Sequence, residues 1–242
     1  MPNSPTRSEA IATIVVPVYN EDASVVEKLL RETYTTFGGT VAMHIVDDGS
    51  DVPCPYATIS SSYNQGYGAA LKEGIRASTT PWIITMDGDG QHRIRDVQRL
   101  IEFVKDFPEY DMVIGNRRLK EESFKRWWGR KLLNWTATLF ANRWIADLNS
   151  GIRIFKREVA LSYEPILCDR FSFTTTITMS FLTDGRLVDW LPIRVLSRSN
   201  GHSKVNLWKD GARTLYYIVK IGLALRTRKL REFTRPLVRW LR

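Results

Sequence analysis

The chain has 242 residues, of which 43% are hydrophobic, so it can bury a sizeable core in one domain and falls outside the intrinsically disordered class. Its formal net charge is +9, and the segment from Lys220 to Arg242, with eight basic residues and one acid, contributes +7 of it. That basic end favours an anionic partner surface, either membrane lipid or nucleic acid. The two cysteines, Cys54 and Cys168, exclude a disulfide framework and indicate ordinary thiols in a reducing compartment.

Strands and helices are predicted to alternate in the first half of the chain. Runs of β-branched and other apolar residues predict buried strands at Ala12–Val18, Val41–Val46, Trp82–Met86 and Asp111–Gly115. Apolar residues at helical spacing predict helices at Asp22–Phe37, Gly66–Ala77 and Ile94–Phe107. This alternation indicates an α/β fold, with a mostly parallel sheet covered by helices on both faces.

The second half is predicted to be more mixed. Its expected helices are Trp127–Ile145, which is rich in aromatic residues, and Thr174–Leu182. Its expected strands are Ile152–Phe155 and Leu187–Val195.

Polar residues follow three of the predicted strands. They are Tyr19-Asn20-Glu21, Asp47-Asp48-Gly49-Ser50 and Asp87-Gly88-Asp89. In open parallel sheets, ligands bind beyond the carboxyl ends of the strands. We therefore expect these acid and amide groups to share one rim of the sheet.

Asp87 and Asp89, with the amide of Gln91, can offer oxygen ligands to one divalent cation. Mg²⁺ and Mn²⁺ prefer such ligands, and often take only a few from protein while phosphates and water complete the shell. The intervening glycines leave room for a diphosphate. A solvated turn explains this segment alone equally well, but an EF-hand does not, because the closing Glu is absent.

Two further glycine-containing segments are weaker signals. Asp47-Asp48-Gly49-Ser50 fits either a simple turn or a carboxylate that binds a base or ribose. Asn64-Gln65-Gly66-Tyr67-Gly68-Ala69-Ala70 lacks the third glycine of a dinucleotide fingerprint and does not follow the first strand. It is better interpreted as a helix start that packs closely against the sheet.

Taken together, these motifs resemble the inverting family-2 glycosyltransferases. The resemblance is carried by Val15-Val16-Pro17-Val18-Tyr19-Asn20-Glu21, Asp47-Asp48-Gly49-Ser50, Asn64-x-Gly66-x-Gly68-x-Ala70 and Met86-Asp87-Gly88-Asp89-Gly90-Gln91-His92. In the second half, Gly115-Asn116-Arg117, Arg130-Lys131-Leu132, Asp147-Leu148-Asn149-Ser150-Gly151 and Arg198-x-x-Gly201-x-Ser203-Lys204 resemble the dolichyl-phosphate or polyprenyl-phosphate mannosyl- and glucosyltransferase branch. The resemblance implies a glycosyltransferase A fold, that is, a Rossmann-like sheet flanked by helices.

The resemblance also implies a role for each matched residue. The residues expected to hold the nucleoside are Pro17, Tyr19, Glu21 and Asp48, and those expected to contact the donor diphosphate are Arg198 and Lys204. Asp87, Asp89 and Gln91 would hold Mg²⁺ or Mn²⁺, and Arg117 and Arg130 would bind the acceptor phosphate. Asp89, Arg117 and Arg130 are thus the expected catalytic residues.

The sequence departs from this branch at two places. Asn134 stands where relatives carry a serine one helical turn after the arginine, which puts that contact in doubt. Gly88 and Gly90 stand where the mannosyltransferases tend to have Ala and Leu, which weakens a claim for mannose specifically. With this resemblance, we expect a flexible N-terminus over residues 1–10, a catalytic domain over 11–205 and a basic amphipathic helical segment over 206–242.

The expected reaction moves mannose or glucose from a GDP- or UDP-hexose to a polyprenyl or dolichyl phosphate. Relatives that glycosylate hydroxyls use a carboxylate base in the second half, whereas Phe171–Ile177 contains no acid. A phosphate oxygen is already anionic near neutral pH and needs no base, which favours a phosphate acceptor. Asp169 keeps a hydroxyl acceptor, on polysaccharide or protein, as an alternative. A nucleic-acid-binding module is a further alternative, but the acidic rim would repel nucleic-acid phosphates, so no such partner is expected.

A membrane surface is also an expected partner. Trp127 and Trp128, beside Lys125 and Arg126, suit the headgroup region, whereas Leu132, Leu139 and Phe140 are expected to pack on the sheet. The first ten residues lack the apolar core of a signal peptide. Apolar runs such as Thr214–Leu225 are shorter than the roughly 20 residues of a spanning helix. We therefore expect a cytoplasmic protein that binds peripherally to the inner face of a membrane.

Overall fold

The fold was analysed in a computed structural model that describes residues 10–117, 124–195 and 212–224. The predicted N-terminal segment 1–10, apart from its last residue, lies outside the described residues, as do Arg198, Lys204 and much of the predicted segment 206–242. The side chain of Arg130 is also outside the description.

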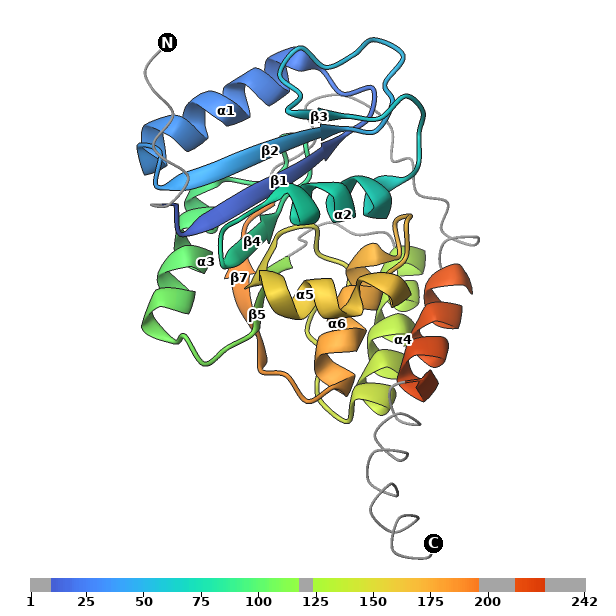
Figure 1. The fold of residues 1–242 in the computed structure, drawn as a ribbon. Helices are drawn as coiled ribbons and strands as arrows, with labels where there is room; N and C mark the ends of the chain where they lie inside the picture. Colours follow the sequence, from blue (N-terminus) through green and yellow to red (C-terminus); the bar gives the residue numbers. More distant parts are fainter. Residues whose placement is uncertain (1–9, 118–123, 196–211, 225–242) are drawn as a thin grey trace, which may run out of the picture.

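A mixed sheet of seven strands forms the centre of the described structure, in the order β3-β2-β1-β4-β6-β5-β7 (Figure 1). The strands are β1 (Ala12–Val18), β2 (Val41–Asp47), β3 (Ile59–Ser60), β4 (Trp82–Thr85), β5 (Met112–Arg117), β6 (Arg153–Lys156) and β7 (Val188–Ile193). Strand β6 runs antiparallel to its neighbours β4 and β5, and the remaining pairs are parallel. The expected mostly parallel sheet is therefore confirmed.

Helices cover both faces of this sheet. Helices α1 (Ala23–Phe37) and α3 (Ile94–Asp106) pack on one face, over the apolar side chains that include Ile14 and Ile84. The other face carries α2 (Tyr67–Ala77), α4 (Phe124–Ala141), α5 (Arg157–Tyr163), the 3₁₀ turn η1 (Glu164–Ile166) and α6 (Phe173–Thr183). Because β1 is buried along its whole length between these layers, its continuous β-branched sequence is what a central parallel strand needs.

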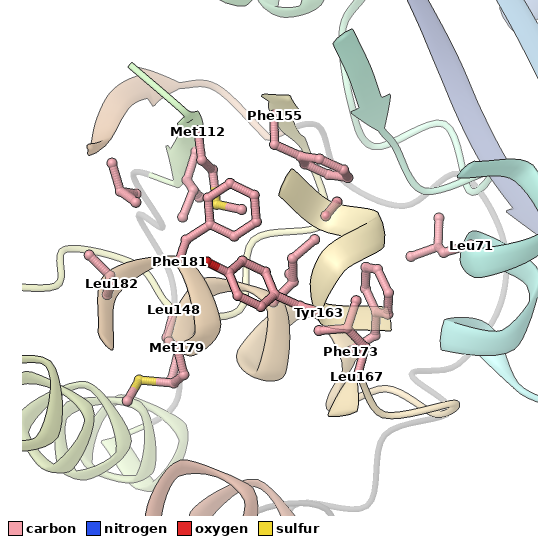
Figure 2. Close-up of a cluster of buried hydrophobic side chains, with 14 of the residues drawn as sticks. Leu71, Met112, Leu148, Phe155, Tyr163, Leu167, Phe173, Met179, Phe181 and Leu182 are labelled. Atoms are coloured by element: carbon pink, nitrogen blue, oxygen red, sulfur yellow. The ribbon is translucent and has the colours of Figure 1, made fainter. Parts of the chain in front are cut away.

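An aromatic cluster fills the space between the sheet and the helices of the second half (Figure 2). Phe181 of α6 lies edge-on to both Phe155 of β6 and Tyr163 of α5, with ring centroids 6.2 and 5.5 Å apart. Edge-to-face pairs at this spacing add attraction beyond the area they bury. The cluster fixes α6 against the antiparallel strand β6, which is the strand that separates β4 from β5.

The predicted elements of the chain correspond to observed ones, although several of their ends differ by a few residues. Strand β3, helix α5 and η1 were not expected, because each is too short to show a period. Helix α4 ends at Ala141 and not at Ile145, since Asn142 takes a left-handed backbone with φ of 51°. The expected packing of Leu132 and Leu139 on the sheet is wrong, because both are more than half exposed.

Residues 212–224 form a further helix beside α4 (Figure 1). The backbone at Gly222 lies so close to Phe140 of α4 that a Cβ there would stand 2.5 Å from the ring. In the part of the chain that is described, none of the helices is both long and apolar enough to cross a bilayer.

Candidate active site

Two aspartates, Asp47 at the end of β2 and Asp48 directly after it, shape the loops at the rim of the sheet. Asp47 accepts hydrogen bonds from the backbone N–H of Ser50 (2.9 Å) and of Cys54 (2.8 Å). Asp48 accepts from the N–H of Gln65 (2.8 Å) and of Gly66 (2.9 Å), so it ties the end of β2 to the start of α2. Asp48 thus already has a structural role, and its expected contact with a nucleoside stays a prediction.

The loop after β1 is locked to the loop after β2. Asn20, with φ of 51°, donates from its backbone N–H to Ser50 Oγ (2.9 Å) and from its amide to Asp51 Oδ2 (2.8 Å). Asp51 N–H donates back to Asn20 Oδ1 at 2.8 Å. Next to these hydrogen bonds, the exposure of the chain increases from Pro17, which is buried, through Tyr19, which is half-buried, to Glu21, which is exposed. The four expected nucleoside residues therefore lie at the ends of two neighbouring strands, with Pro17 inside β1 and the other three in the loops that follow β1 and β2.

The Asp87–Gln91 turn follows β4 and crosses β1 closely. A Cβ on Gly88 would stand 2.9 Å from Val18 Cγ1, so only glycine lets the turn pass this strand. Asp87 then lies beside β1, while Asp89 Oδ1 accepts the backbone N–H of Gln91 at 3.0 Å. Asp87, Asp89 and Gln91 are all partly exposed, as ligands that share a cation with a substrate must be.

The Asp87 carboxylate lies between the side chains of Tyr67 and His92. Tyr67 Oη donates to Asp87 Oδ1 at 2.8 Å, and His92 Nε2 lies 3.4 Å from Asp87 Oδ2. Burial alone would raise the pKa of Asp87, but His92, Tyr67 and the Arg117 guanidinium together lower it. Asp87 is therefore held in its ionised form, which is the form that binds a cation.

Arg117, at the end of β5, is clamped by a buried carboxylate. Its Nε and Nη2 donate to Asp147 Oδ2 (2.8 Å) and Oδ1 (3.0 Å). The Asp147 side chain is 0% exposed and that of Arg117 is 24% exposed. Burial alone would raise the pKa of Asp147, but the charge and hydrogen bonds of Arg117 lower it. The pair fixes the direction of one guanidinium edge.

A second arginine, Arg153, lies fully buried in β6. It donates to Thr174 O and Thr178 Oγ1 at 2.8 Å each and to Ser150 O, and its Nε has no hydrogen-bond partner among the described residues. Burial lowers its pKa to about 10, so the side chain still carries its charge near neutral pH. Tyr67, Asp147 and Asp87 partly counter this lowering of the pKa. Because Arg153 pairs with Thr85 of β4, a buried cation lies near the start of the acidic turn.

Two other residues considered for the site, Asn134 and Asp169, have partners within the fold. The amide of Asn134 donates to Ala146 O at 3.1 Å, so it holds the chain after α4. The carboxylate of Asp169, the alternative base, lies 2.6 Å from Lys72 Nζ. Arg130 lies on α4, but its side chain is not described.

Asp87, Asp89 and Gln91 supply only some of the ligands that a divalent cation needs. Among the described residues, no group of three or more His, Cys, Asp or Glu side chains is arranged to hold a metal ion. Two carboxylates and one amide are hard oxygen ligands, and such a partial set suits Mg²⁺ or Mn²⁺ when substrate phosphates complete the shell.

A sequence model described as Glycosyl transferase family 2 matches residues 13–163, which includes the whole acidic rim. The chain belongs to glycosyl transferase family 2.

Several relatives within this family carry the names of lipid-phosphate transferases. An undecaprenyl-phosphate mannosyltransferase of Micrococcus luteus is 25% identical over 180 residues, which are 72% of this chain and 70% of that protein. An undecaprenyl-phosphate 4-deoxy-4-formamido-L-arabinose transferase of Aeromonas hydrophila is 27% identical over 214 residues, covering 81% of this chain and 63% of that protein. An uncharacterised protein of Methanocaldococcus jannaschii is 27% identical over 224 residues, covering 85% of this chain and 90% of that one.

Solved structures show the same fold. Glucosyl-3-phosphoglycerate synthase from Mycobacterium tuberculosis, in complex with Mn²⁺, UDP-glucose and phosphoglyceric acid, superposes with a TM-score of 0.70. It is 14% identical and covers 89% of this chain and 81% of its own. At this low sequence identity, the two proteins can be said to share a fold and no more. That fold is a glycosyltransferase A-like architecture.

The sequence did not predict the roles of Tyr67, Asp147 and Arg153 in this family-2 site, although Tyr67 and Asp147 lie within two of its motifs. Tyr67 lay in the glycine segment and Asp147 in the second-half motif, but their partners Asp87 and Arg117 are 20 and 30 residues away. Arg153 left a clearer signal, since a charged residue between Ile152 and Ile154 interrupts a predicted buried strand.

Proposed function

We propose that this family-2 enzyme transfers a hexose, mannose or glucose, from a GDP- or UDP-sugar to a polyprenyl or dolichyl phosphate with inversion, using Mg²⁺ or Mn²⁺. The names of the Micrococcus luteus and Aeromonas hydrophila relatives support a lipid-phosphate acceptor. The Mn²⁺ and UDP-glucose of the structural neighbour support a cation and a nucleotide-sugar donor.

One observation carries the proposal: β4 and β5 run parallel to each other on either side of β6, so that Asp87, just after β4, and Arg117, at the end of β5, lie at the same edge of the sheet. A side chain that can bind an anionic acceptor therefore lies at the same rim as the carboxylate expected to hold the donor's cation. Sugar transfer needs both substrates in one place, with the acceptor oxygen near the anomeric carbon. Arg117 and Asp87, at the carboxyl ends of two parallel strands of one sheet, meet this need.

The cation site would be formed by Asp87, Asp89 and Gln91, with the donor diphosphate supplying further oxygens. When bound, the cation neutralises the charge that develops on the departing diphosphate. Arg198 and Lys204 are proposed to contact the same diphosphate, and Pro17, Tyr19, Glu21 and Asp48 to hold the nucleoside. In this scheme Asp87 and Asp89 bind and orient, and neither has to accept a proton.

The acceptor side is proposed to use cations instead of a base. Arg117 is held by Asp147 through Nε and Nη2, and Arg130 lies on α4. The carboxylate of the alternative base Asp169 is engaged by Lys72 Nζ at 2.6 Å, so it would have to leave this ion pair to reach an acceptor hydroxyl. A phosphate oxygen needs no proton removed, so these residues suit a phosphate better than a hydroxyl acceptor.

The exposed face of α4 supports a peripheral location at the inner face of a membrane. Trp128, Leu132, Trp135 and Leu139 follow one another at helical spacing, and each is at least 54% exposed. Helix α4 contains no acidic residue, and neither do residues 212–224 beside it. In that second segment, Lys220 Nζ lies 5.7 Å from the centroid of the Tyr216 ring. Exposed tryptophans among basic residues suit the headgroup region of an anionic leaflet.

The test is a transfer assay with the purified protein. Radiolabelled GDP-mannose and UDP-glucose are each offered with undecaprenyl phosphate, and in parallel with undecaprenol, in Mg²⁺ or Mn²⁺. We expect label in the lipid only when the phosphate is present, and none after chelation of the metal. Equal labelling of undecaprenol, or transfer that persists without metal, would contradict the proposal.

A further inference from the structure

The Asp87 carboxylate is held from three sides by residues that are not themselves expected metal ligands. Tyr67 Oη donates to one carboxylate oxygen at 2.8 Å, and His92 Nε2 lies 3.4 Å from the other. The backbone at Gly151 closes the third side, because a Cβ there would stand 2.2 Å from Asp87 Oδ2. The carboxylate therefore cannot turn freely about its last bond.

The phenol of Tyr67 is itself held in place by an aromatic neighbour. The Phe171 ring stacks on the Tyr67 ring, with centroids 5.5 Å apart and planes 20° from parallel. Tyr67 is the first residue of α2, whereas Phe171 lies just before α6, so the stack joins two elements that are far apart in the sequence.

The segment that carries Phe171 is fastened to α2 by hydrogen bonds. Ala69 N–H donates to Asp169 O at 2.9 Å. Lys72 Nζ donates to both Leu167 O and Asp169 Oδ1 at 2.6 Å. These bonds keep the Phe171 ring over Tyr67, so the position of the phenol is fixed by the fold and not by the ligand.

We propose that Tyr67 is a positioning residue for the metal-binding carboxylate Asp87, and that Phe171 acts as its brace. The inference rests on the proposed function, in which Asp87 holds the cation. A metal ligand binds best when its lone pairs already point at the ion, and donors behind the ligand commonly provide this orientation. Tyr67 holds Oδ1 of Asp87 from the protein side, which gives the carboxylate a fixed direction relative to the expected cation site.

A simpler explanation is that Tyr67 only satisfies its own hydroxyl group. Buried tyrosines generally find a hydrogen-bond partner, and Asp87 is the partner within reach. The two explanations differ in what happens to cation binding when the hydroxyl is removed. A purely structural hydroxyl leaves cation affinity unchanged, whereas a positioning hydroxyl lowers it.

The decisive variant is Tyr67→Phe, which keeps the ring and its stack on Phe171 but removes the hydroxyl. Free Mn²⁺ is measured by electron paramagnetic resonance in the presence of UDP or GDP, whichever the wild-type protein binds. We expect Mn²⁺ affinity to fall about 10- to 100-fold, as is typical when a partner behind a metal ligand is lost. Turnover is expected to recover substantially at saturating Mn²⁺, because the ligand itself is still present.

Two further variants complete the experiment. Tyr63→Phe is the matched control, since Tyr63 is 66% exposed on the loop before α2, and we expect it to bind Mn²⁺ as the wild type does. Phe171→Leu keeps the phenol but removes the brace, and a smaller loss of Mn²⁺ affinity is expected. Should Tyr67→Phe melt far below the wild type, a loss of Mn²⁺ affinity in Phe171→Leu still supports the inference, and no loss overturns it.

The outcomes separate this inference from the proposed function. If Tyr67→Phe is folded and binds Mn²⁺ as tightly as the wild type, Tyr67 does not position Asp87. The proposed transfer function would still stand in that case, because it does not depend on Tyr67. If the wild-type protein binds no Mn²⁺ with either nucleotide and transfers no sugar, the proposed function fails and the inference fails with it.

Discussion

Replacing Asp147 by Asn tests the buried ion pair at the acceptor side of the site. Asp147 is fully buried and accepts Arg117 Nε at 2.8 Å and Nη2 at 3.0 Å. Asparagine keeps the shape but removes the charge, and its NH₂ group would face one of the guanidinium donors. Breaking a buried ion pair from one side costs about 3–5 kcal/mol, because a charge is left without its partner.

The lower end of that range applies here, because the Arg117 side chain keeps 24% of its exposure and water can solvate it in part. We expect the free energy of unfolding to fall by about 3 kcal/mol. At roughly 2–4 °C per kcal/mol for a protein of this size, the melting temperature should drop by about 6–12 °C. Thermal unfolding followed by circular dichroism measures this drop. The same variant should raise the KM for undecaprenyl phosphate, since Arg117 loses its fixed direction.

The pH dependence gives a second check on the same pair. The folded-state pKa of Asp147 is lowered, so its contribution to stability is present above the ordinary aspartate pKa of about 3.9 and is lost as pH falls toward the folded-state value. The difference in stability between the wild type and Asp147→Asn should therefore be constant from pH 8 to about pH 5 and shrink below about pH 4. A difference under about 1 kcal/mol at pH 7 would refute the reasoning, because it is the range expected of an exposed pair.

Two further predictions concern the proposed transfer reaction, and a third concerns the membrane contact. Asp89→Asn should abolish transfer while the melting temperature stays near that of the wild type, and unchanged turnover would remove the cation role of Asp89. Arg130→Ala should raise the KM for undecaprenyl phosphate more than that for the nucleotide-sugar, and an equal rise in both would count against the acceptor assignment. Trp135→Ser combined with Leu139→Ser should reduce sedimentation with vesicles containing anionic lipid, without loss of stability because both residues are exposed; full retention on the vesicles would exclude this face of α4 as a membrane contact.

The order of the main elements and the identity of the rim were predictable from local patterns. Strand β1 matches its prediction at both ends, because a strand buried on both faces must be apolar at every position, and this appears directly in the sequence. The acidic turn after β4 was predictable for a related reason. Polar residues that follow a buried strand have to lie at the end of the sheet, and parallel strands bring these ends together.

Only the tertiary structure decided which of these groups touch. The pairing of Arg117 with Asp147, and of Tyr67 with Asp87, depends on how separate segments cross at the rim, and no local period encodes such a crossing. The exposed face of α4 was hidden for the same reason: the spacing of Leu132 and Leu139 shows that they share a side of the helix, but not whether that side meets the sheet or the solvent. Local sequence determines the elements, whereas the direction in which each side chain faces is settled by packing among residues that are distant along the chain.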